Sequence, residues 1–114
     1  METSKAKRPF VNYFIGPDSF GSWKKYYRWV EKDLPSIYCK AYEINRKFKY
    51  FKICFDNICD DGMIVSVDEN KLFDLGLNYE NEKVKKEIKK VNELMSTLLD
   101  TIKQDMDKYI KRRN

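Results

Sequence analysis

Residues 80–112 read ENEKVKKEIKKVNELMSTLLDTIKQDMDKYIKR and contain neither proline nor glycine. Apolar residues recur in this stretch at alternating spacings of four and three. They are Val84, Ile88, Val91, Met95, Leu98 and Ile102. This spacing places them on one stripe of an α-helix and is also the heptad pattern of a coiled coil. We therefore predict a long amphipathic helix that reaches about 50 Å.

Two interpretations of the apolar stripe stay open at this point. The stripe can pack along a sheet of the same chain, or it can pair with a second copy as a homodimeric coiled coil. The length and the regular heptads favour pairing. Leu94, Leu99 and Met106 widen the apolar face, which favours packing on a broad surface. The stripe residues are thus our predicted dimer or partner interface.

The segment before this helix predicts a strand followed by a shorter helix. Residues 10–16 are apolar and aromatic, and Pro17 follows them, which is typical of a strand that ends in a turn. Apolar residues then recur at spacings of three and four from Ser19 to Leu34, which predicts a helix. Pro35 is expected to end it.

Two runs with alternating side chains follow, at residues 36–44 and 47–55. Alternation predicts strands, and Asn45-Arg46 between the runs suits a tight hairpin. Residues 56–62 resemble a loop, and residues 63–67 a further short strand. The sequence leaves residues 68–77 without an assignment.

These elements predict an α+β fold. It has a small antiparallel sheet of three or four strands, one helix on a face, and the long C-terminal helix, which is a candidate coiled coil. We divide the chain into a flexible basic arm at 1–8, an α+β domain at 9–77, and the C-terminal helix at 78–114.

The composition excludes most catalytic chemistry. The chain contains no histidine, three cysteines and four isolated glycines, so it has neither a His-activated nucleophile nor a glycine-rich phosphate loop. We predict a non-enzymatic protein with no cofactor and no metal. The basic N-terminus has no apolar stretch behind it, and no run of about 18 apolar residues follows, which predicts a cytoplasmic or nuclear protein that does not enter membranes.

The charge and the aromatic content favour a polyanionic partner. The net charge is +5, and aromatic residues make up 15% of the chain. Lys24, Lys25 and Arg28 share one face of the 19–34 helix. The predicted sheet presents aromatics and lysines together on its other face. They are Phe14, Tyr38, Lys40, Tyr42, Phe48, Tyr50 and Lys52. Rings that stack on bases beside lysines that attract phosphates suit RNA or another single-stranded nucleic acid.

Part of the chain resembles the RNA recognition motif family over residues 10–55. Residues 13–18, YFIGPD, are similar to the hexamer on that family's first strand, and residues 46–53, RKFKYFKI, to the octamer on its third. Lys47 and Lys49 stand where the octamer has glycines. The resemblance implies that Phe14, Phe48 and Tyr50 stack on RNA bases.

A different class of function also fits the sequence. An exposed stripe on the long helix, together with exposed aromatics such as Trp29, would suit a protein–protein adaptor or inhibitor. Salt dependence distinguishes the two functions, because phosphate contacts weaken steeply with salt and an apolar interface does not.

Overall fold

A computed structural model describes residues 8–58 and 62–111 of the chain. The predicted basic arm at 1–8 therefore lies almost wholly outside the described residues. The elements, in chain order, are β1 (Tyr13–Ile15), α1 (Pro17–Phe20), α2 (Trp23–Lys32), α3 (Leu34–Asn45), β2 (Lys52–Ile58), β3 (Gly62–Asp68), α4 (Asn70–Asp74) and α5 (Glu82–Lys111).

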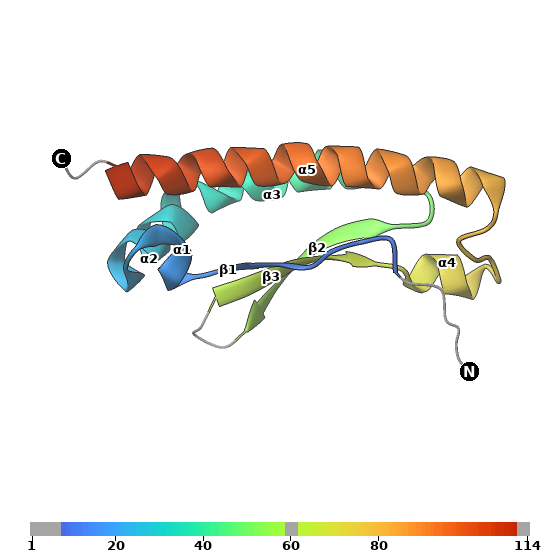
Figure 1. The fold of residues 1–114 in the computed structure, drawn as a ribbon, viewed down its shortest axis with the longest axis horizontal. Coiled ribbons are helices and arrows are strands. Elements are labelled where there is room, and N and C mark those ends of the chain that lie inside the picture. The colour runs from blue at the N-terminus through green and yellow to red at the C-terminus, as the bar shows by residue number, and fades with distance from the viewer. Residues whose placement is uncertain (1–7, 59–61, 112–114) are drawn as a thin grey trace.

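The fold is α+β, as the sequence predicts. The three strands form one antiparallel sheet in the order β1-β3-β2, so β3 is central and β2 is an edge strand. In Figure 1, α5 and α3 lie side by side over one face of the sheet, and none of the described helices covers the opposite face. None of the described helices has the length and apolar character needed to cross a lipid bilayer.

The apolar stripe of α5 lies inside the core of this chain. Val84, Val91 and Ile102 have no solvent-exposed surface, Met95 and Leu98 are also buried, and Ile88 packs against the same cluster. The structure shows the stripe packed inside its own chain, where the sheet and the other helices cover it. Association of two copies through α5 stays a prediction.

Residues 36–44 form a helix, so the predicted strand there is wrong. Leu34, Ile37 and Ala41 follow each other at spacings of three and four and are all buried. The helical period places Leu34, Ile37 and Ala41 together on the core side, which the apparent alternation would not do. Pro35 lies in the first turn of α3, where its missing N–H costs nothing, so it begins a helix rather than ending one.

The hairpin predicted at Asn45-Arg46 is also wrong. β2 begins only at Lys52 and pairs with β3, with Ile53 opposite Val67. Gly62 begins β3 with φ +138°, and a Cβ there would lie 2.4 Å from the carbonyl oxygen of Ile15. Only glycine therefore lets β3 approach the end of β1 this closely.

The predicted helix from 19 to 34 is divided by Gly21, whose φ of 89° ends α1. Trp29 on α2 is fully buried, so it is not the exposed partner anchor that the adaptor hypothesis requires. Its indole Nε1–H donates to Asp105 Oδ2 of α5 at 3.0 Å. Phe20 lies beside it, with ring centroids 5.0 Å apart.

Candidate functional site

The edge strand β2 and the helix α3 lie next to each other with a groove between them. The rings of Tyr38 on α3 and Phe55 on β2 meet edge to face at 5.3 Å. Further along, the side-chain amide of Asn45 is hydrogen-bonded to the backbone of Ile53. Because residue numbers rise along α3 while they fall along β2, the two elements run in opposite directions and stay adjacent over this length.

Three adjoining hollows follow this pair of elements. The first, of about 280 Å³, is lined by Tyr26, Tyr27 and Tyr38 among others. The second, of about 320 Å³, shares Tyr38 with the first and Tyr42 with the third. The third, of about 520 Å³, lies beyond the end of α3. We call the three together the α3–β2 groove.

Aromatic side chains line the groove while remaining exposed. Tyr27 is 46% exposed, Tyr38 43% and Tyr42 68%. Trp23, one turn before Tyr27, is 44% exposed, and their ring centroids are 5.3 Å apart. Large exposed aromatics that are gathered along one groove leave apolar surface in water, and this is typical of a binding site rather than of a plain surface.

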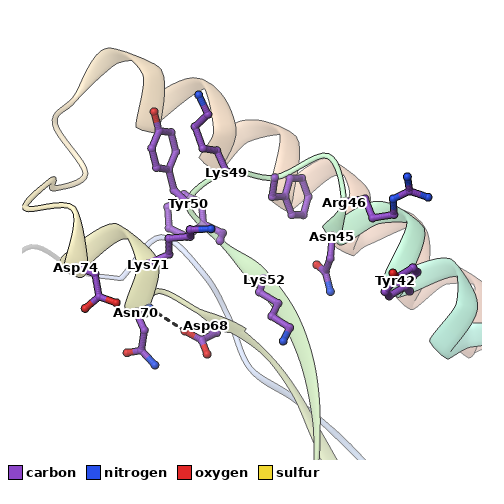
Figure 2. A pocket seen from close by; sticks show the side chains of 12 residues that line it. Tyr42, Asn45, Arg46, Lys49, Tyr50, Lys52, Asp68, Asn70, Lys71 and Asp74 are labelled. Atoms are coloured by element: carbon purple, nitrogen blue, oxygen red, sulfur yellow. Dashed lines mark hydrogen bonds between the residues drawn. The ribbon is translucent and has the colours of Figure 1, made fainter.

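Cationic side chains surround the third hollow, which we call the cationic hollow. They are Arg46, Lys49, Lys52 and Lys71, against the two carboxylates Asp68 and Asp74. In Figure 2, Lys71 extends from α4 toward the middle of the hollow, and Tyr42 and Arg46 stand together at the α3 end. The excess of two positive charges gives this end of the groove an attraction for anions.

A carboxylate on α5 fixes the loop that carries Lys49. The Glu87 side chain accepts hydrogen bonds from the backbone N–H groups of Lys49 at 2.9 Å, Tyr50 at 2.6 Å and Phe51 at 3.2 Å. Three donors on one carboxylate hold the loop in a single conformation. The wall of the cationic hollow is therefore preorganised by the long helix.

Asn45 occupies part of the open edge of β2. Its Nδ2 donates to the Ile53 carbonyl at 3.0 Å, and its Oδ1 accepts from the Ile53 N–H at 2.8 Å. Because outward-facing backbone groups recur at every second residue of an edge strand, those of Phe55 and Asn57 also face the groove. The groove thus offers hydrogen-bonding groups as well as aromatic rings.

Several residues predicted as binding residues lie at or near the groove. Tyr38, Tyr42 and Lys52 line it. Phe48 lines the cationic hollow but is partly buried, and Tyr50 is only 7% exposed. The placement of both on a sheet face is therefore wrong, since the octamer-like stretch is mostly loop.

The other predicted residues lie apart from the groove. Lys24, Lys25 and Arg28 belong to α2, on the helix that carries Trp23 and Tyr27. Lys40 is exposed on α3 but lines none of the hollows. Phe14, 51% exposed, projects from β1.

The sequence does not indicate several of the groove residues, among them Tyr27, Arg46 and Lys71. Tyr27 belongs to the apolar stripe predicted for the 19–34 helix, and Arg46 to the predicted hairpin turn. Lys71 fell in the unassigned segment. Only the fold brings α4 next to the end of α3, so no local signal identifies Lys71.

A second polar cluster ties the ends of the described domain together. The Glu69 side chain is buried and accepts from Arg8 Nε at 2.5 Å and from the Tyr79 hydroxyl. Arg8 also donates to the Val67 carbonyl at 2.9 Å. Burial and the Glu69 hydrogen bond raise the pKa of Tyr79 to about 12. Every member has a partner, so this cluster is structural.

Comparisons with protein-family models, with curated proteins and with solved structures find no match to this chain. Within the described residues, no three cysteine or carboxylate side chains are gathered as a metal site would require.

Proposed function

We propose that the protein binds single-stranded nucleic acid along the α3–β2 groove. The observation that carries the proposal is the adjacency of the three hollows, in which exposed tyrosines line the first two and the cationic hollow shares Tyr42 with the second. Base–aromatic stacking contributes about 1–3 kcal/mol per base, and lysine or arginine side chains contact the phosphates.

The groove suits a single strand better than a duplex. A duplex offers phosphates to a positive surface but keeps the faces of its bases stacked inside, where tyrosines do not reach them. Tyr38 and Tyr42 line the hollow between a helix and a strand, and Tyr42 is the most exposed of the large apolar and aromatic side chains in the described chain. Unpaired bases can stack on such rings.

Fluorescence anisotropy of a labelled single-stranded RNA, titrated at several salt concentrations, tests the proposal. If all four cations of the hollow contact phosphates, the slope of log affinity against log salt should be about −2.8. The Tyr42→Ala variant should weaken binding by about 1–3 kcal/mol, roughly 5- to 150-fold in Kd.

Phe73→Ala is the matched control, because Phe73 is 58% exposed but lies outside the groove. It should bind as the unchanged protein does. Absence of RNA and DNA binding at low salt, or equal losses in the two variants, would contradict the proposal.

The open edge of β2 supports a second candidate, a protein–protein adaptor. An extended peptide can add to an edge strand by pairing with outward-facing backbone groups such as those of Phe55 and Asn57. Such binding would respond weakly to salt, since the backbone groups are uncharged. A salt-insensitive peptide ligand with no nucleic-acid binding would favour this candidate.

A further inference from the structure

The basic residues of the cationic hollow come from different parts of the chain. Arg46 follows α3, Lys49 belongs to the loop before β2, Lys52 begins β2, and Lys71 lies on α4. Residues from the loop at 46–51, from the start of β2 and from α4 thus line one space of about 520 Å³. A volume of this size suits a ligand of nucleotide dimensions.

The four basic side chains take no part in stabilising the described part of the fold. Within residues 8–58 and 62–111, none of their side chains makes an ion pair or a hydrogen bond to another residue. Asp68 Oδ1 accepts from the Asn70 N–H at 2.8 Å, which holds one of the two carboxylates in place. Like charges held around one hollow repel each other, and a bound anion relieves that repulsion.

The hollow also lies at an end of the groove. Asn70, Lys71 and Asp74 of α4 line it on the side away from α3. The chain end of a nucleic acid differs from its interior when it carries a phosphate monoester. That group has a charge near −2 at neutral pH, against −1 for an internal phosphodiester.

We propose that the cationic hollow binds the phosphorylated terminal nucleotide of a single strand. Tyr42 at the rim stacks on the terminal base, and Arg46, Lys49, Lys52 and Lys71 surround the phosphate monoester. This inference rests on the proposed nucleic-acid binding and specifies which part of the strand the groove selects.

The test uses three oligonucleotides of one sequence with an internal fluorophore: a 5′-phosphate, a 3′-phosphate, and hydroxyls at both ends. Anisotropy at moderate salt should show one phosphorylated end binding at least about fivefold more tightly than the hydroxyl-ended strand. Lys71→Gln should reduce that preference to below about twofold, because it should weaken binding of the phosphorylated strand more than binding of the hydroxyl-ended strand.

Lys103→Gln removes an exposed lysine of α5 that lines none of the hollows, and it should keep the full preference. Circular dichroism of both variants checks the fold. Equal affinity for the three ends would overturn this inference and leave the proposed function standing. A preference that survives both Lys71→Gln and Arg46→Gln would also overturn it. Failure of every strand to bind would refute the proposed function first.

Discussion

Trp29 shows what one buried hydrogen bond contributes at the scale of a residue. Its indole N–H donates to Asp105, and the ring is fully buried. Trp29→Phe should lower the free energy of unfolding by about 2–3 kcal/mol, because a bond to a charged acceptor is lost and a small cavity is left. Urea denaturation measures the change.

Trp23→Phe is the control for this substitution. Trp23 is 44% exposed, and its replacement should change the free energy of unfolding by less than about 0.5 kcal/mol. Equal effects of the two substitutions would show that the Asp105 bond contributes nothing.

Two tyrosines make the stability sensitive to alkaline pH. Burial, followed by hydrogen bonds to Glu69 and Asp33, raises the pKa of both Tyr79 and Tyr109 to about 12. An unfolded tyrosine titrates near 10, so between about pH 10 and 12 the unfolded chain releases protons that the folded chain keeps. The stabilisation from each group is complete below pH 10 and is lost as the pH rises through 12.

Thermal unfolding between pH 9 and 12 tests this dependence. Tyr79→Phe and Tyr109→Phe should each flatten the decline in melting temperature over that range, although each variant starts lower at pH 9 because it lacks a hydrogen bond. The informative quantity is the difference in slope between each variant and the unchanged protein. Identical slopes in the variants and the unchanged protein would contradict the assignment.

At the scale of an element, Glu87 couples α5 to the loop before β2. Glu87→Ala should leave three backbone N–H groups without their acceptor, and it should lower the free energy of unfolding by about 1.5–3 kcal/mol. Hydrogen exchange should accelerate most at Lys49 and Tyr50. Glu93→Ala, at an exposed position of the same helix, should leave those exchange rates unchanged.

The same substitution connects stability with binding. Because Lys49 is carried by the anchored loop and lines the cationic hollow, loosening the loop should weaken nucleic-acid binding as well. An unchanged Kd in Glu87→Ala would show that Lys49 takes no part in it.

The elements differ in how far the sequence predicts them. α5 was predicted within two residues at its start, because about eight turns without proline or glycine leave no competing pattern. The sequence predicts a strand where α3 lies. Over the 12 residues of α3, the apolar side chains fit both the two-residue period of a strand and the period of about 3.6 residues of a helix. The burial of Leu34 and Ile37 distinguishes the helix from a strand, but this burial is known only from the folded structure.

The candidate site was predictable in composition and not in position. The sequence indicates that tyrosines and lysines gather on one surface, and Tyr38, Tyr42 and Lys52 do line the groove. Their predicted place on a sheet face failed because two of the three lie on a helix. Contributions from α4 depend on tertiary packing, which no local pattern encodes.

At the scale of the whole molecule, α5 extends along most of the longest dimension of 51 Å (Figure 1). Near its C-terminal end Tyr109 packs against Phe20 and donates to Asp33 at 2.7 Å. Near its other end Glu87 holds the loop. Both ends of the molecule therefore depend on one helix, and we expect them to unfold together.

Ile102→Ala tests whether the α5 stripe stabilises the single chain. Ile102 is fully buried, so the substitution should lower the free energy of unfolding by about 2–5 kcal/mol. The denaturation midpoint should not depend on protein concentration, because the stripe contacts its own chain. A midpoint that rises with concentration would instead indicate that association through α5 stabilises the fold.

The place of α5 in the chain also has a consequence for synthesis. All three strands precede it, so the ribosome completes the sheet before the residues that cover its inner face have been made. At about 5–20 residues per second, the 30 residues of α5 take seconds to appear. During that interval Val65 and Val67, which are buried in the finished molecule, lack their cover. The nascent chain should therefore be a substrate for chaperones that hold apolar segments until α5 has been made.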